Sequence, residues 1–197
     1  MAHPPARAQA LIAILAPRGR RDSIVGDLLE EYHETQVPQH GVAAADRWFM
    51  RQALGFVWNA AALPGALVGI VIAGRTLIDV AAPVADTAER AWLTTLATMM
   101  VFAVTGFRVG LVTRRVSGAI VTALAATAIG TVAAYGATLA SMAIAATFVH
   151  PDAAVWVGLR EGLDVPAHVI ALIGTAFACL GAAIGREFPR WPSPSGV

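Results

Sequence analysis

The stretch LGFVWNAAALPGALVGIVIAG, residues 54–74, holds twenty-one consecutive residues without a charged side chain. A helix of this length spans about 30 Å, the thickness of the hydrocarbon core of a bilayer. Three further apolar segments follow, at about residues 87–112, 118–142 and 167–185. Only 14% of the 197 residues are charged and 57% are hydrophobic, which is too little polar surface for a soluble domain. We therefore predict an all-α membrane protein with a four-helix transmembrane bundle over residues 53–186.

The distribution of arginine predicts the orientation of these helices, because the cytoplasmic flanks of membrane helices carry an excess of positive charge. All fourteen basic residues of the chain are arginine. With the N-terminus inside, eleven arginines fall on the cytoplasmic side and three on the outer side. This asymmetry favours four spans with both termini in the cytoplasm.

Two segments outside the spans have expected structures of their own. In residues 152–163, a helix would place Val155, Trp156 and Leu159 against lipid and Arg160 towards water, which is typical of an interfacial helix. Residues 187–197 are rich in Pro and Ser, a composition typical of a disordered tail.

Residues 1–52 precede the spans and are expected to form a small cytoplasmic helical domain, the prefix. Periodicity and Gly or Pro breaks predict three helices, over residues 6–16, 23–36 and 42–52. Asp22 is the expected N-cap of the second helix, and Pro38 with Gly41 is expected to break the chain after it. The third helix is expected to continue into the first membrane segment.

Within this prefix, the motif GDLLEEY at residues 26–32 is followed by W-x-x-R-Q at residues 48–52. Further matching positions are Pro5, Leu11, Leu15, Pro17, Arg21, Val25 and Gly41. On these residues the segment resembles the permease prefix domain, which precedes large orphan permeases of the ABC macrolide-exporter type and also small membrane proteins. The resemblance covers about a quarter of the chain. It implies a cytoplasmic helical module fused to a membrane anchor in the bacterial inner membrane.

Four apolar segments in about 145 residues cannot supply the large periplasmic domain and long permease body of those exporters, so the resemblance implies no export activity. The function that we predict is an accessory or assembly subunit of a membrane complex, related to an ABC-type transporter or to another membrane protein. The prefix would dock this partner through acidic, aromatic and arginine side chains: Asp27, Glu30, Glu31, Tyr32, Trp48 and Arg51.

Several other functions are disfavoured by the sequence. It carries no nucleophile elbow, phosphate loop, zinc motif or catalytic carboxylate pair, so we expect no enzyme activity, no cofactor and no metal. The net charge of +1, without a clustered basic face, argues against nucleic-acid binding.

Polar residues inside the spans support an alternative function. They form stripes on three helices, namely Thr98, Thr105 and Arg108, then Thr131, Tyr135 and Thr138, then His168 and Thr175. A shared polar seam would make the chain a small transporter, alone or as a homodimer. A membrane sensor or regulator acting through the prefix is a third interpretation. We favour hydrogen bonding within and between helices, because no acidic residue lies inside a span to carry a proton or cation.

Three Gly-x-x-x-Gly motifs are expected to allow close helix packing, and they begin at Gly65, Gly106 and Gly181. Packing within the chain is the favoured interpretation of these motifs. Association of two copies is the alternative, which leaves a homo-oligomer open.

Overall fold

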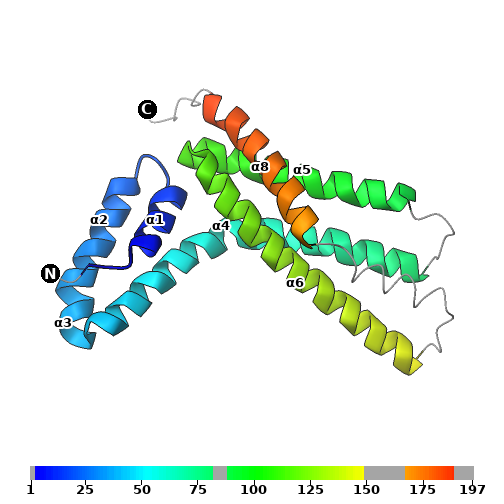
Figure 1. Ribbon diagram of the computed structural model, residues 1–197, viewed down its shortest axis with the longest axis horizontal. Helices are drawn as coiled ribbons and strands as arrows, with labels where there is room; N and C mark the ends of the chain where they lie inside the picture. The colour runs from blue at the N-terminus through cyan, green and yellow to red at the C-terminus, as the bar shows by residue number, and fades with distance from the viewer. Residues whose placement is uncertain (1–2, 82–87, 149–166, 189–197) are drawn as a thin grey trace, which may run out of the picture.

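The computed structural model describes residues 3–81, 88–148 and 167–188, and all regular structure in these ranges is helical (Figure 1). The elements in chain order are α1 (Ala6–Leu15), α2 (Arg21–Glu31), the π-helix η1 (Tyr32–Gln36), α3 (Val37–His40), α4 (Val42–Ala81), α5 (Ala88–Thr113), α6 (Val116–Phe148) and α8 (Ala167–Glu187). The all-α architecture predicted from the sequence is confirmed. The interfacial helix expected over residues 152–163 and the tail beyond residue 188 lie outside the described residues.

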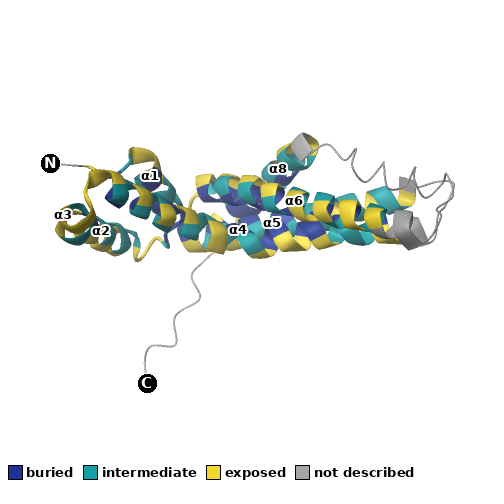
Figure 2. Ribbon diagram, turned by 90° about the horizontal axis from the view of Figure 1, so that it is seen from below, coloured by how far each residue is buried: buried dark blue, intermediate teal, exposed yellow. Residues whose placement is uncertain are grey.

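Among the residues that the structure describes, four helices are long and apolar enough to cross a membrane. Their apolar spans are Val42–Ile78, Glu89–Thr113, Val116–Ala143 and Val169–Glu187. In the most apolar window of each span, fewer than half of the residues are buried inside the protein. Large apolar side chains such as Trp58, Leu63 and Trp92 are 60–67% exposed, and Figure 2 shows exposed residues along the outer faces of the long helices. Because lipid accommodates such a surface and water does not, the chain is a multi-pass integral membrane protein.

The four long helices alternate in direction. Helices α4 and α6 run away from the prefix, and α5 and α8 return towards it (Figure 1). Helix α4 packs mainly on α6, and α5 packs mainly on α8. The prefix, the α5–α6 turn and the C-terminal end of α8 therefore lie at one end of the bundle.

Glycines allow α4 to pack closely on α6. A Cβ atom added at Gly65 would lie 2.7 Å from Ile129 Cβ, and one at Gly69 would lie 2.8 Å from Ala133 Cβ. Real Cβ atoms do not approach other atoms so closely, so larger residues would force these helices apart. The Gly-x-x-x-Gly motif that begins at Gly65 therefore mediates packing between two helices of the same chain.

The second helix pair uses two such motifs facing each other. Gly106 and Gly110 of α5 lie against the backbone of Ala178 and Ala182 on α8. In return, Gly181 and Gly185 of α8 lie against the backbone of residues 103–111 on α5. The predicted packing within the chain is therefore confirmed for all three motifs.

The prefix has an apolar core that is separate from the bundle core. Its buried members come from α1, η1 and the first turns of α4, and they are Ala8, Ile12, Tyr32, Ala45, Phe49 and Ala53. Apolar residues of α2 are partly buried against them. As predicted, the last prefix helix continues into the membrane, and α4 runs without a break for 40 residues.

The expected helix break at Pro38 is wrong, because the chain stays helical to His40. Proline has no N–H group and normally breaks an α-helix. Here the π-turn shifts the hydrogen-bond register, with the N–H of Val37 bonded to the carbonyl of Tyr32 five residues back. Pro38 then lies in the first turn of α3, where no N–H donor is required. The break comes at Gly41, whose φ of 77° places it in the left-handed region.

The expected N-cap of the second prefix helix is also wrong. Helix α2 begins at Arg21 with Arg20 at the N-cap position, and no side chain caps it. A turn closed by the N–H of Arg20 and the carbonyl of Pro17, at 3.0 Å, starts the helix earlier than expected. Asp22 lies in the first helical turn, where its carboxylate complements the positive end of the helix dipole.

Candidate functional site: the prefix and its junction with the bundle

Helix α2 presents an acidic face to solvent. Asp27, Glu30 and Glu31 are all exposed, and no residue of α2 is fully buried. Their hydrogen-bond partners are neutral: Ser23 Oγ donates to Asp27 Oδ2 at 3.5 Å, and Gln36 Nε2 donates to Glu31 Oε1 at 3.4 Å. Within the described ranges, none of the three carboxylates forms an ion pair with an arginine. Their negative charge is therefore available to a partner.

Tyr32, which the sequence motif suggested as a docking residue, lies in the prefix core instead. Its ring is fully buried and meets Phe49 edge to face at 5.9 Å between centroids. Its hydroxyl donates to Asp46 Oδ1 at 2.7 Å. Burial, together with the hydrogen bond and the negative charge of Asp46, raises the pKa of Tyr32 to about 12. The side chain stabilises the prefix and is not available to a partner.

The two remaining expected docking residues lie one turn apart on α4. Trp48 is half-buried and packs at 6.0 Å, edge to face, on Phe49 of the prefix core. Arg51 is exposed. These two side chains come from α4, whereas the acidic face lies on α2.

The loop between α1 and α2 joins the prefix to the bundle. The N–H of Arg18 donates to the carbonyl of Val112 at 3.2 Å, and Arg21 Nη2 donates to the carbonyl of Thr113 at 3.3 Å. These are the last carbonyls of α5, which have no partner within their own helix. Burial lowers the pKa of Arg21, and the positive charges of Arg115 and Arg18 lower it further. The prefix is thus held to the negative end of a membrane helix.

Arg114 makes the corresponding contact between the α5–α6 turn and α8. Its φ of 57° is left-handed, which ends α5 and turns the chain into α6. Its Nη1 donates to the carbonyls of Arg186 and Phe188, the latter at 2.8 Å. The end of α5 and the α5–α6 turn therefore contact both the prefix and the end of α8. No sequence pattern indicates these arginine contacts, because the carbonyl partners lie more than seventy residues away along the chain.

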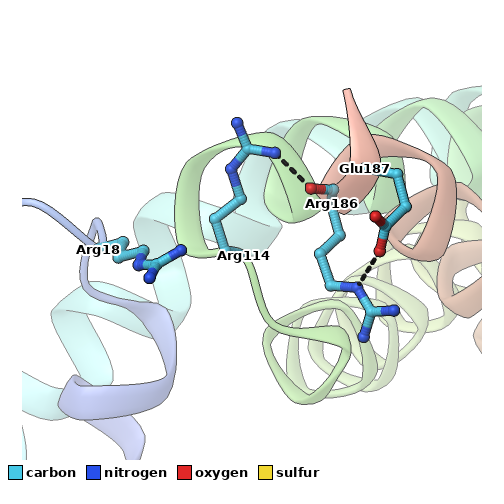
Figure 3. A pocket seen from close by; sticks show the side chains of 4 residues that line it. All are labelled: Arg18, Arg114, Arg186 and Glu187. Atoms are coloured by element: carbon cyan, nitrogen blue, oxygen red, sulfur yellow. Dashed lines mark hydrogen bonds and ion pairs between the residues drawn. The ribbon is translucent and has the colours of Figure 1, made fainter. Parts of the chain in front are cut away.

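A hollow of about 530 Å³ lies at this junction (Figure 3). It is lined by Arg18, Arg114, Arg186 and Glu187. Arg186 Nε and Glu187 Oε1 form an ion pair at 2.9 Å. The lining therefore holds three guanidinium groups and one carboxylate, and its net charge is positive.

The stripes of polar residues in the spans are largely satisfied by their own helices. The hydroxyls of Thr98, Thr105 and Thr138 donate to the carbonyl four residues back, at 2.7–2.9 Å. Such bonds are common for threonine in membrane helices and need no polar path. The buried hydroxyls of Thr131 and Thr175 have no hydrogen-bond partner among the residues described.

The other expected members of the seam are placed differently. Arg108 is exposed on α5 and so does not lie inside the bundle, whereas Tyr135 is half-buried on α6. The side chain of His168 lies outside the described part of the structure. Among the seam residues whose side chains are described, the one charged residue, Arg108, therefore lies on the outside of the bundle.

Comparison with known proteins adds no identification, since no family model, curated protein or solved structure matches the chain. The residues of the chain and their geometry make it a multi-pass integral membrane protein with a helical prefix at one end of the bundle.

Proposed function

We propose that this protein is a non-enzymatic accessory or assembly subunit of a membrane complex in the bacterial inner membrane, and that its prefix docks a protein partner. The resemblance to the permease prefix domain supports this proposal and suggests a complex related to ABC-type transporters. The observation that carries it is the exposed acidic face formed by Asp27, Glu30 and Glu31 on α2.

The acidic face of α2 lies apart from the arginines at the prefix junction, and this favours a protein partner over a lipid surface. Residues 3–52 contain six arginines and six carboxylates, so the prefix has no net charge. Arg18 and Arg21 bond the last carbonyls of α5 at the junction, whereas the acidic face lies further along α2, which runs away from the bundle (Figure 1). Anionic lipid repels such a face, while a basic protein surface attracts it.

The acidic face is held rigidly, which lowers the entropic cost of docking. The hydrogen bond of Tyr32 to Asp46 fixes the end of α2 to α4, and the bond of Arg21 to Thr113 fixes its start to the bundle. A partner bound to α2 would therefore be positioned relative to the membrane helices.

Affinity purification from native membranes in mild detergent, followed by mass spectrometry, tests this proposal. Wild type is compared with the variant Asp27→Asn/Glu30→Gln/Glu31→Gln. The control is Glu89→Gln, which removes an exposed carboxylate at the far end of the bundle. A stoichiometric partner that is lost with the triple variant and kept with the control supports docking. Recovery of the wild-type protein alone, at normal abundance, contradicts it.

A small transporter is the second candidate, favoured by the unpartnered buried hydroxyls of Thr131 and Thr175. A transporter predicts that Thr131→Val or Tyr135→Phe changes flux and leaves assembly unchanged. A regulator acting through the prefix would instead change downstream expression when the gene is deleted, without altering either flux or assembly.

A further inference from the structure

The arginine-lined hollow at the prefix junction contains guanidinium N–H donors that have no hydrogen-bond partner among the described residues. The Arg18 guanidinium has no hydrogen bond or ion pair with any residue in the described ranges. Arg186 bonds Glu187 through Nε, and Arg114 bonds the α8 carbonyls through Nη1, so terminal nitrogens of both remain. Guanidinium groups match the oxygens of a phosphate in geometry and charge.

Further positive charge surrounds the hollow. Arg20 lies in the α1–α2 loop, Arg21 begins α2, and Arg115 follows Arg114 in the α5–α6 turn. Burial lowers the pKa of Arg21 most; Arg115 and Arg18 lower it further, and the carboxylate of Asp22 opposes the shift. A bound anion would relieve the repulsion among these cations.

The position of the hollow indicates where the anion comes from. Three spans end beside it, at Thr113, Val116 and Glu187, which is the level of lipid headgroups. On α8, Ile184 and Leu180 lie one and two turns below Glu187 on the same face, and they are 51% and 58% exposed. An acyl chain can pack along this apolar strip, whereas a free phosphate ion has no apolar part that would contact it.

We propose that this hollow binds the phosphate headgroup of an anionic phospholipid. Arg18 and Arg186 contact the phosphate, and the acyl chains extend along Ile184 and Leu180 into the bilayer. The bound lipid bridges the prefix loop to the end of α8. This inference is independent of the docking of a protein partner by α2.

Native mass spectrometry of the full-length protein in mild detergent tests the site. The protein is mixed with equal amounts of phosphatidylglycerol and phosphatidylcholine, and bound lipids are counted. The test variant is Arg18→Gln/Arg186→Gln. The matched control is Arg7→Gln/Arg47→Gln, which removes the same charge from two exposed prefix positions outside the hollow.

Wild type is expected to retain phosphatidylglycerol in preference to phosphatidylcholine. Retention is expected to fall at least about fivefold in the test variant, since one arginine near an anionic lipid surface accounts for roughly that factor. The control is expected to behave as wild type. Equal retention of the two lipids by wild type overturns the proposal, and this measurement needs no variant. Equal retention of phosphatidylglycerol by the test variant and the control variant also overturns it.

A separate arm distinguishes the lipid from free phosphate. The thermal stability of delipidated wild type is measured with phosphatidylglycerol and with millimolar inorganic phosphate. Stabilisation by phosphatidylglycerol alone supports a lipid site. Equal stabilisation by inorganic phosphate overturns the lipid assignment.

Discussion

The hydroxyl of Tyr32 donates a 2.7 Å hydrogen bond to Asp46 Oδ1 and so ties the π-turn of the prefix to the helix that enters the membrane. Tyr32→Phe keeps the ring but removes this hydrogen bond, so the half-buried carboxylate of Asp46 loses the tyrosine donor. We expect the prefix to lose about 1–2 kcal/mol of stability against local opening. Hydrogen exchange of the prefix amides in detergent measures the loss. Tyr135→Phe, at the only other tyrosine, is the control and should leave these amides unchanged.

The raised pKa of Tyr32 predicts a loss of prefix stability at high pH. Tyrosine ionises near pH 10 in the unfolded chain and near pH 12 in the folded prefix. Between these pH values the unfolded state binds fewer protons than the folded state, so the stability of the prefix falls as pH rises from 10 to 12. Below pH 10 the contribution of the Tyr32 hydroxyl to this stability is fully present. Thermal unfolding midpoints of wild type and Tyr32→Phe, measured across this range, should converge. A constant difference between the two proteins would refute the assignment.

Close packing of α5 on α8 predicts opposite results at two glycines. A Cβ at Gly106 would overlap the backbone of Ala178, so Gly106→Ala should destabilise the bundle by about 1–3 kcal/mol. Gly136 on α6 has no atom within 4 Å of a built Cβ, so Gly136→Ala should be neutral or stabilising by up to about 1 kcal/mol. Fluorescence-detected gel filtration after heating compares the two. Equal effects would mean that the described α5–α8 contact is not made.

The left-handed backbone of Arg114 predicts an unusual order of stabilities. Both Arg114→Gly and Arg114→Ala remove the guanidinium bonds to the carbonyls of Arg186 and Phe188. Only glycine adopts a φ of 57° without strain, so the alanine variant should be the less stable by about 1 kcal/mol. Thermal unfolding in detergent gives the order. Greater stability of the alanine variant would show that the turn is not left-handed.

Most of the bundle could be predicted from the sequence, because its span lengths are fixed by hydrophobicity. The second span was expected at residues 87–112 and is observed as α5, Ala88–Thr113, since Glu89 and the Arg114–Arg115 pair bracket the apolar stretch. The third span was expected to end at residue 142 and ends at Ala143, while helix α6 itself continues to Phe148 through an alanine-rich segment.

The candidate site was less predictable, and Tyr32 shows one reason. It was grouped with the acidic docking residues by its place in the GDLLEEY motif. Its spacing from Leu28 and Leu29 places it on the apolar stripe of the helix, so the signal for burial was present in the sequence. The contacts of Arg21 and Arg114 had no such signal, since they join carbonyls whose proximity is created only by the tertiary fold.

The docking claim is tested most directly by site-specific photo-crosslinking in cells. A photo-reactive amino acid is placed at Glu30 on the acidic face, and at Arg7 on α1 as an exposed control position. We expect one discrete crosslinked protein from position 30 and none from position 7. Absence of a crosslink at Glu30, with the protein at normal abundance in the membrane, would contradict the account.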